Sequence, residues 1–541
     1  MTSKQLKDLQ QQTKGQVTTD EAVRKYFSTD GSIFTITPEA VAYPRNTHDV
    51  QAVVSYVYQQ NLRGKNLNVV ARGKGTDQAG GALGDGIILA LPAHMNKILR
   101  VGKDSATVQP GVLYSSLQRI LHMHERFLPP YPSSIDYSTI GGAAANNACG
   151  EKTLKYGSTR EWVKSLKVVL ADGSEIETKK LTGRELNRKK GLMTLEGEIY
   201  RRVDSLIRDN SALIHQSQPK TTKNSAGYAL GRVRQNGYFD LSQLFIGAQG
   251  TLGVITEVTL KTAPYNPRTT LVVGYFDDLE KAGEAVLRLQ KLKPSAMEVV
   301  DYHLLKFLQQ YKPETLKGLV PDPLPKIIVL IEFDNTSQLK QNILSRRAAR
   351  IVSKMSGTHT IAKKPKEQEA LWQVRHSAAA VIWMAAGKKK SLPIIEDGVV
   401  PVEKFPEFLE ATYKLLNKFK LDIAVWGHAG DANLHLQPIM DLSKIADRKK
   451  IIKLMNEFYT MVIKMGGSTC GEHNDGLLRA PYLEKLYGPA MYRLFEEVKD
   501  ICDPHNVFNP RIKLGVQQKD LEPLMRREYS MEHLYDHMPH T

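Results

Sequence analysis

The sequence of 541 residues is too long for one hydrophobic core, so two or three domains are expected. Hydrophobic residues at 41% and charged residues at 24% are typical of a soluble globular protein, and no apolar run approaches the roughly 20 residues that span a bilayer. The formal net charge of +17 favours anionic partners such as small acids, and the lack of a nucleic-acid-binding motif argues against nucleic acid.

The N-terminal half begins with a polar stretch, residues 1–33, that predicts a helical extension without a signal or transit peptide. Residues 34–265 then alternate between helical and strand patterns. Residues 50–60 predict an amphipathic helix, and a hairpin is expected to turn on Asp172-Gly173. This part of the chain therefore predicts a mixed domain of helices and strands.

A second domain is expected over residues 266–500, after a proline-containing linker. Residues 269–276 and 326–333 predict strands, and a helical stretch follows each of them. The remaining residues, 501–541, are rich in turns and then helical.

A glycine-rich loop follows the predicted strand at residues 67–71. In Arg72–Gly81, four glycines and a threonine let backbone N–H groups crowd around an anion such as a pyrophosphate. The loop lacks the dinucleotide-binding fingerprint, because Gln78 stands where the third glycine is needed and no long helix is expected next. Taken alone, it would equally suit a surface turn.

Two further segments are rich in small residues. Ser138–Gly150 and Phe245–Thr256 carry no charged side chain. Such segments suit a close approach of the backbone to a large planar ligand rather than exposure as linkers.

A histidine string lies in the second domain. In His428-Ala-Gly-Asp-Ala-Asn-Leu-His435, apolar runs on both sides predict two strands joined by a turn, which brings the histidines together. Glu472 and His473 add a carboxylate and an imidazole further along the chain. Imidazole and carboxylate are ordinary ligands of Zn²⁺ and similar ions, but spacing alone equally allows histidines that are hydrogen-bonded at strand ends.

Together, the three small-residue segments resemble, in order and spacing, the FAD domain of the vanillyl-alcohol oxidase (PCMH-type) superfamily. The histidine string narrows the resemblance to the FAD-linked oxidase branch of D-lactate, glycolate and D-2-hydroxyglutarate dehydrogenases. The resemblance covers about residues 35–515. It implies an α+β fold, with a two-subdomain PCMH-type FAD-binding domain over 34–265. An α/β cap domain with an antiparallel sheet and flanking helices follows over 266–500, and residues 501–541 return to the flavin domain.

The resemblance also implies a set of FAD-binding residues. The pyrophosphate would lie at Arg72, Gly73, Lys74, Gly75, Thr76, Gly80 and Gly81. The ribityl chain and ring would contact Thr139, Gly141, Gly142, Ala145 and Asn146. Gly157 and Ile255 would contact the adenine side, and Asn509 would approach from the C-terminal end. No histidine lies between Arg72 and Leu91, so the flavin is expected to be non-covalent.

The chain departs from the family pattern at two carboxylates. Gln249 stands where relatives usually carry the glutamate of Gly-Ser-Glu-Gly, and Ala229 stands where they often carry the aspartate of Gly-Tyr-Asp-Leu. Neither change removes an expected FAD ligand. Both would alter the potential of the flavin or the order of its loops.

The histidine string and its neighbours suit the oxidation of a 2-hydroxy acid. A divalent ion, with Zn²⁺ favoured, would bind His428, His435 and Glu472 and polarise the hydroxyl group, and His473 would accept its proton. The alternative for His473 is a supporting or core histidine.

The substrate carboxylate would need a cationic anchor. Arg375 is the expected anchor, although a helix-surface arginine is the alternative. Lys223 is a weaker candidate, expected near the flavin, and Glu396-Asp397 would either support a histidine or lie on the surface.

The expected function is an FAD- and metal-dependent D-2-hydroxy-acid dehydrogenase, with D-lactate favoured because no second arginine is evident for a second carboxylate. D-2-hydroxyglutarate and glycolate are alternative substrates. A non-redox flavin-dependent transferase resembling alkylglycerone-phosphate synthase and a catalytically inert flavin-binding subunit are alternatives of another class.

The three cysteines form no CxxC motif, so a cysteine-ligated iron–sulfur cluster is not expected. Electrons would pass to a separate acceptor, namely a quinone, an electron-transfer flavoprotein or an iron–sulfur protein. A cytoplasmic location is expected, and peripheral contact with the inner face of the membrane and a homodimer stay open.

Overall fold

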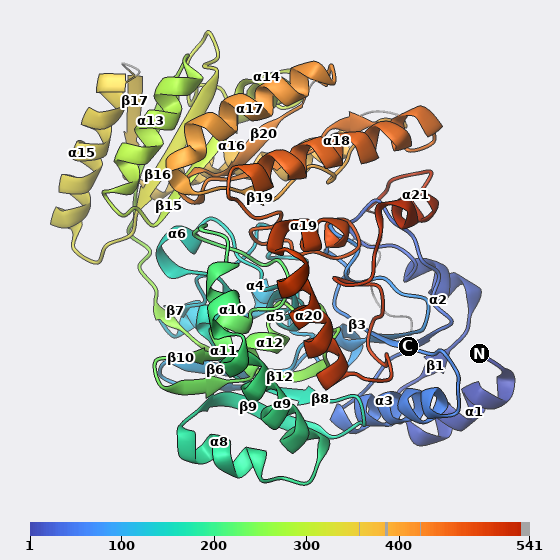
Figure 1. The fold of residues 1–541 in the computed structure, drawn as a ribbon. Helices are drawn as coiled ribbons and strands as arrows, with labels where there is room; N and C mark the ends of the chain where they lie inside the picture. The colour runs from blue at the N-terminus through green and yellow to red at the C-terminus, as the bar shows by residue number, and fades with distance from the viewer. Residues whose placement is uncertain (356–357, 385–387, 422, 532–541) are drawn as a thin grey trace.

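The computed structural model describes residues 1–355, 358–384, 388–421 and 423–531, so the end of the expected C-terminal segment lies outside the described residues. The cap domain lies above the flavin domain in Figure 1, and the polypeptide returns from the cap to the flavin domain at its C-terminal end. None of the helices in these ranges is both long and apolar enough to cross a membrane.

The first subdomain is a four-stranded sheet in the order β1-β2-β4-β3, in which β2, β4 and β3 are parallel. Helix α3 covers it because Val50, Val53, Val54 and Val57 recur on one helical face and pack against the sheet. The strands are β1 (Val17–Thr18), β2 (Ala40–Ala42), β3 (Val69–Arg72) and β4 (Ile87–Ala90). The helices are α1 (Ser3–Gln12), α2 (Glu21–Tyr26) and α3 (Thr47–Leu62).

The second subdomain is a seven-stranded antiparallel sheet in the order β10-β11-β9-β8-β12-β6-β5. The predicted hairpin is present, since β8 and β9 pair around Asp172 and Gly173. The strands are β5 (Ile98–Val101), β6 (Ser105–Val108), β8 (Val163–Val169), β9 (Glu175–Leu181), β10 (Arg234–Gln235), β11 (Tyr238–Asp240) and β12 (Val254–Lys261). The helices include α4 (Tyr114–Met123), α5 (Ile140–Asn146), α6 (Thr153–Tyr156), α8 (Gly183–Lys190), α9 (Leu195–Asp209) and α10 (Ser211–Gln216).

The cap is built on a second seven-stranded antiparallel sheet in the order β17-β14-β16-β15-β20-β21-β19. Alternate residues of its central strands point to opposite faces, and both faces are covered by helices, which explains why β14 and β16 are buried along their whole length. The strands are β14 (Thr270–Phe276), β15 (Ala296–Asp301), β16 (Ile327–Phe333), β17 (Thr358–Ala362), β19 (Gly398–Val399), β20 (Val425–His428) and β21 (Asn433–Leu436).

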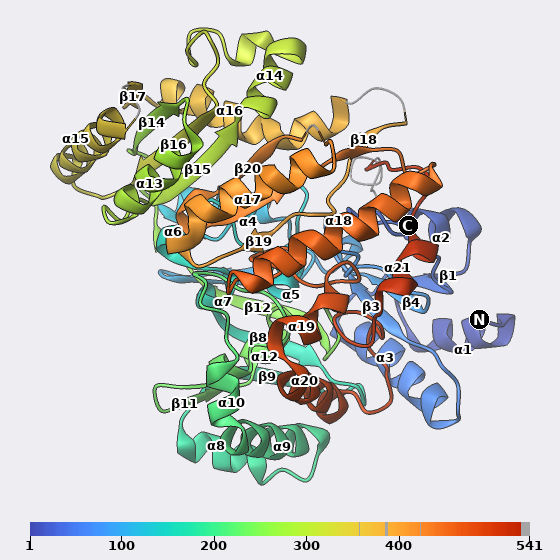
Figure 2. The same ribbon diagram turned by 45° about the horizontal axis from the view of Figure 1, so that its top comes forward.

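The cap helices divide between the two faces of this sheet (Figure 2). One face packs against α13 (Leu279–Gln290), α15 (Gln338–Met355), α17 (Phe405–Lys418) and α18 (Ile445–Lys464). The other packs against α14 (Tyr302–Tyr311) and α16 (Pro365–Met384). The sheet with helices on both faces has the layered form that the sequence predicts for the cap.

The C-terminal part of the chain joins the two domains. Helix α20 (Pro489–Cys502) packs in the core of the second flavin subdomain. The following segment lies beside β3, where Val69 N–H donates to Val507 O at 2.7 Å and Asn509 N–H donates to Val69 O at 3.0 Å. The strand that leads into the glycine loop is therefore held by residues from the far end of the chain.

Candidate active site

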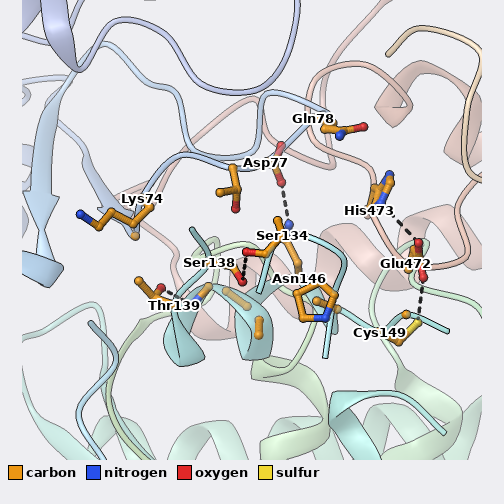
Figure 3. Close-up of a pocket in the computed structure, with 18 of the residues that line it drawn as sticks. Lys74, Asp77, Gln78, Ser134, Ser138, Thr139, Asn146, Cys149, Glu472 and His473 are labelled. Carbon is orange, nitrogen blue, oxygen red and sulfur yellow. Dashed lines mark hydrogen bonds and ion pairs between the residues drawn. The ribbon is translucent and has the colours of Figure 1, made fainter. Parts of the chain in front are cut away.

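A cavity of about 420 Å³ is lined by both domains, and it brings the glycine-rich segments to the histidine string (Figure 3). Of the residues expected to bind FAD, those on its wall are Gly73, Lys74, Gly75, Thr76, Gly81, Thr139, Gly141, Gly142, Ala145, Asn146 and Ile255. The expected metal and catalytic residues on its wall are Arg375, His428, His435, Glu472 and His473. Segments separated by hundreds of residues thus share one cavity.

Four of the expected flavin residues lie away from this wall: Arg72, Gly80, Gly157 and Asn509. The guanidinium of Arg72 is buried and donates to Thr29 O at 2.7 Å and to Ala82 O at 3.3 Å. Asn509 Nδ2 donates to Gly81 O at 3.0 Å. The side chains of Arg72 and Asn509 therefore fix the glycine loop in place rather than face the cavity.

The glycine loop and α5 approach each other closely. Thr139 is the N-cap of α5, and its Oγ1 accepts a hydrogen bond from Gly142 N–H at 3.2 Å. A Cβ atom at Gly73 would lie 2.6 Å from Thr139 Oγ1, and one at Gly141 would lie 2.4 Å from Pro110 Cβ. A side chain at position 73 would push the glycine loop away from the N-terminus of α5, and one at position 141 would push α5 away from the segment that contains Pro110.

The chemistry of this wall fits FAD. Its backbone and small side chains suit a large planar group, and Lys74, whose pKa burial lowers, provides a cation for a phosphate. The buried Oε1 of Gln78, also on the wall, has no hydrogen-bond partner among the residues that the structure describes. A ligand N–H in the cavity would satisfy it.

The histidine string forms the predicted pair of strands. β20 and β21 are antiparallel, Trp426 pairs with His435, and a short 3₁₀ turn, Ala429–Asp431, joins the strands. Both His428 and His435 are buried. This confirms the expected turn and brings the two imidazoles together.

Glu472 lies where the imidazoles converge. Its Oε1 is 3.1 Å from His428 Nε2, 3.1 Å from His435 Nε2 and 3.4 Å from His473 Nε2. Its Oε2 is 3.0 Å from Lys223 Nζ and 3.4 Å from Cys149 Sγ. One carboxylate oxygen thus faces three imidazoles, and the other is held by a buried lysine and a thiol.

His428, His435 and Glu472 provide donor atoms close enough to one another to hold a metal ion. His435 Nδ1 is 3.2 Å from Glu396 Oε2 while its Nε2 faces Glu472, so the ring lies between two carboxylates. Burial lowers the pKa of His435 to about 4 despite Glu472, which leaves one N–H for two carboxylates. One ring nitrogen therefore directs its lone pair at a carboxylate oxygen, and the two repel each other. A metal ion bound between them would remove this repulsion.

His428 has the same arrangement. Its Nδ1 is 2.7 Å from Glu298 Oε1, and its Nε2 faces Glu472. Although burial lowers it, Glu298 and Glu472 raise the pKa of His428 to about 9, so, unlike His435, this imidazole donates to both carboxylates when no ion is bound. A metal ion at Nε2 would have to displace that proton. Two imidazoles with carboxylates behind Nδ1 and a third carboxylate in front of Nε2 are the donor set and the supporting groups of a zinc-type site.

His473 is held by the paired carboxylates that precede β19. Its Nδ1 is 2.5 Å from Glu396 Oε2, and its backbone N–H donates to Asp397 Oδ2 at 2.7 Å. Burial lowers the pKa of His473, but Asp397 and Glu472 outweigh this effect, so the pKa is raised. A cation bound to Glu472 would offset part of this increase and favour the neutral base.

The sequence did not show whether several charged side chains are buried or lie on the surface, and the structure does. Glu396 and Asp397 are fully buried, so they are not surface charges. Arg375 is also buried, with Nε and Nη2 each 2.9 Å from Glu298 Oε2, so it is not a helix-surface arginine. Lys223, which was expected near the flavin rather than the substrate, is buried with its Nζ 3.0 Å from Glu472 Oε2.

Glu298 is a supporting residue that sequence reasoning missed. It lies in β15, whose six residues are all buried. A carboxylate within an otherwise largely apolar strand was the signal that could have identified it, because such a group must have a buried partner.

Comparison with known families identifies the two domains. Residues 38–179 match the FAD binding domain, and residues 266–512 match the FAD linked oxidases, C-terminal domain. The chain therefore carries both the FAD binding domain and the C-terminal domain of FAD linked oxidases. The expected α+β fold, with a PCMH-type FAD-binding domain and an antiparallel cap sheet with flanking helices, is thereby confirmed.

Relatives of this chain are named for three hydroxy acids. It is 28% identical over 512 residues to D-2-hydroxyglutarate dehydrogenase of Pantoea ananatis, a match that covers 92% of this chain but 50% of the relative. It is 28% identical over 480 residues to glycolate oxidase subunit GlcD of Bacillus subtilis, covering 87% of this chain and 88% of that one. It is also 28% identical over 487 residues to D-lactate dehydrogenase of Anaerostipes hadrus, covering 87% and 89%. The chain thus spans about half the length of the first relative.

Solved structures share the fold at lower identity. 4-Ethylphenol oxidase from Gulosibacter chungangensis has a TM-score of 0.67 and 19% identity, over 96% of this chain and 99% of that chain. An alkyldihydroxyacetonephosphate synthase has a TM-score of 0.65 and 16% identity, over 94% and 86%. At these identities the likeness shows the fold alone.

Proposed function

We propose that the protein is an FAD- and metal-dependent dehydrogenase that oxidises a D-2-hydroxy acid, with D-lactate favoured, to the 2-oxo acid. The observation that carries the proposal is that His428, His435, Glu472, His473 and Arg375 share one cavity with the glycine-rich segments of the FAD-binding domain. The FAD-linked oxidase domain and relatives named for hydroxy acids support it.

Arg375 is the proposed anchor of the substrate carboxylate. The guanidinium is fixed by Glu298 through Nε and Nη2, which leaves Nη1 outside this ion pair. A guanidinium held in one orientation binds a carboxylate with little loss of side-chain freedom. Among the described residues on the cavity wall, Arg375 is the only arginine, which favours a monocarboxylate such as D-lactate over D-2-hydroxyglutarate.

His473 is the proposed base. The Glu396 carboxylate at Nδ1 favours the tautomer with its proton on Nδ1, so Nε2 carries the lone pair that accepts the substrate hydroxyl proton. When bound, FAD supplies the hydride acceptor, and a divalent ion, for which Zn²⁺ is proposed, supplies a Lewis acid that lowers the pKa of the hydroxyl. Burial of the cluster excludes bulk water and strengthens these interactions.

A separate electron acceptor completes the proposal. The buried cysteines Cys149, Cys470 and Cys502 form no cluster motif along the chain. The flavin would therefore be reoxidised by a quinone, an electron-transfer flavoprotein or an iron–sulfur protein. Reoxidation of the flavin by a separate acceptor and a cytoplasmic location are parts of the proposal.

Anaerobic reduction of the bound flavin tests the proposed function. D-Lactate should bleach the flavin absorbance while L-lactate does not, and D-2-hydroxyglutarate and glycolate test the alternative acids. No bleaching with any 2-hydroxy acid would contradict the proposal and favour an inert flavin-binding subunit or a non-redox transferase. A transferase has no evident need for the imidazole–carboxylate cluster, so the effect of chelation separates these classes further.

A further inference from the structure

Gln249 forms a bridge between the glycine loop and the segment that carries His473. Its Nε2 donates to Asp77 Oδ2 at 3.1 Å, and its Oε1 accepts from Gly476 N–H at 2.8 Å. Asp77 belongs to the loop on the cavity wall, and Gly476 lies three residues after the proposed base. A single amide side chain thus connects the expected FAD site to the catalytic segment.

Asp77 is the other half of the bridge, and N–H groups surround its carboxylate. Oδ1 accepts from Ala79 N–H at 2.8 Å and from Gly81 N–H at 2.9 Å. Oδ2 accepts from Asn146 Nδ2 at 2.7 Å, as Figure 3 shows, and from Gln249. The carboxylate therefore ties the glycine loop to α5 and to Gln249 at the same time.

The surroundings of Gln249 fix its side-chain amide in one orientation. The residue is buried at 5% exposure and has a φ of 52°, a left-handed conformation that costs a non-glycine residue about 1 kcal/mol. Because Gly476 presents a donor and Asp77 presents an acceptor, only an amide satisfies both. A glutamate at this position would direct a second carboxylate at Asp77.

We propose that Asp77 and Gln249 are a positioning pair that holds the glycine loop of the FAD site against the His473 segment. In this pair, Asp77 supplies a carboxylate to the hydrogen bond with Gln249, at whose position the family pattern carries a glutamate. The glutamine at position 249 then need not be a loss, because the negative charge is carried by Asp77, which accepts the hydrogen bond from Gln249. The inference rests on the proposed function for the identity of the flavin.

A double-mutant cycle tests this pair in the full-length protein. Q249E places two carboxylates in contact, and D77N turns an NH₂ group toward the NH₂ groups of Asn146 and Gln249. Each single variant should weaken FAD binding at least tenfold. D77N/Q249E restores one carboxylate and one amide, with acceptors for Gly476 N–H and for the loop amide, although the NH₂ group of residue 77 still faces Asn146 Nδ2. Its Kd for FAD should therefore lie between that of wild type and those of the single variants, at least threefold below that of Q249E.

Two further measurements separate positioning from general stability. The single variants should shift the midpoint potential of the bound flavin and lower the rate of flavin reduction, and the double variant should recover part of the rate. Gln118 provides a matched control, because it is a buried glutamine of the same domain that bonds Leu128 N–H and O away from the cavity wall. Q118E should destabilise the protein, and D77N should not rescue it.

The outcomes decide the inference separately from the proposed function. A double variant that binds FAD no better than Q249E, or that fails to fold where Q249E also fails, would overturn the positioning pair. A single Q249E variant with wild-type FAD affinity and rate would do the same. If no 2-hydroxy acid reduces the flavin of the wild-type protein, the proposed function is contradicted. The double-mutant cycle measured by FAD affinity still tests the positioning pair in that case.

Discussion

His473 Nδ1 lies 2.5 Å from Oε2 of Glu396, the shortest contact that this imidazole makes with a carboxylate in the active site. Glu396 is fully buried, and its other oxygen is ion-paired with Arg479, which is also fully buried. The carboxylate therefore cannot rotate away from the histidine without breaking a buried ion pair. This relationship sets the tautomer and the orientation of the proposed base.

Removing the base should abolish most of the activity while leaving the cofactor bound. His473→Ala should lower the rate of flavin reduction by about 10²- to 10⁴-fold, because proton transfer by a positioned side chain contributes this much. Anaerobic stopped-flow absorbance measures the rate, and the flavin content of the purified variant should equal that of wild type.

His359 is a suitable control for this substitution, since it lies on strand β17 away from the cavity wall. His359→Ala should retain the wild-type rate. A His473→Ala variant that matches this control would assign the proton transfer to another group.

Chelation should uncouple flavin binding from flavin reduction. Treatment with a strong chelator should lower the rate of reduction by D-lactate at least 100-fold with the flavin absorbance retained, and Zn²⁺ should restore it. His435→Gln should lower the metal content measured by mass spectrometry to well below one ion per chain. A rate that is unchanged when the metal content reaches zero would refute the role of the ion.

Removing the carboxylate anchor should act mainly on substrate binding. Arg375→Met should lower kcat/KM for D-lactate by about 10- to 100-fold, chiefly through KM, because a hydrogen bond to a charged group contributes about 1.5–3 kcal/mol. Glu298 would keep His428 but lose its buried arginine, so the thermal unfolding temperature must be measured in parallel. Equal losses for D-lactate and its neutral amide would show that Arg375 does not bind the carboxylate.

The free energy of unfolding should depend on pH because of Asp30, a buried carboxyl group beneath the glycine loop. Burial, reinforced by Asp77 and opposed by Arg72, raises the pKa of Asp30 from 3.8 to about 7. The folded protein then binds a proton that the unfolded chain releases, so this group's stabilising contribution falls as pH rises from about 4 to about 7.

Asp30→Asn removes this titration. The free energy of unfolding of Asp30→Asn, relative to that of wild type, should increase by about 2–4 kcal/mol as the pH rises from 4.5 to 8. Urea denaturation of both proteins across this range measures it. If the difference in unfolding free energy between the two proteins does not change with pH, Asp30 titrates in its ordinary range.

Local patterns made much of the fold and part of the site predictable. The spacing of apolar residues predicted α3, the hairpin of β8 and β9, and the strands on either side of the His428–His435 turn, because each depends on residues that are neighbours in the sequence. Glycine at positions 73 and 141 likewise indicated a close approach of backbone segments.

The direction in which a side chain points was less predictable. Arg72 lies in a loop whose sequence suggests phosphate binding, yet its guanidinium turns to the backbone of residues 27–29 and 82. The sequence likewise did not show that Lys223 forms a buried ion pair with Glu472. A sequence pattern gives the place of a residue in the chain, whereas the partner of a buried charge is the nearest opposite charge in space.

The sequence by itself determined that the chain carries an FAD-binding domain, a cap with a histidine hairpin, and the residue types needed for metal and proton chemistry. The tertiary structure decided which charges support that chemistry: Glu298 behind His428, Glu396 behind His435 and His473, and Lys223 on Glu472. These partners come from strands and loops far apart in the sequence. Burial makes an unpaired charge so costly that the fold must bring them together, and only the packed structure shows which pairs result.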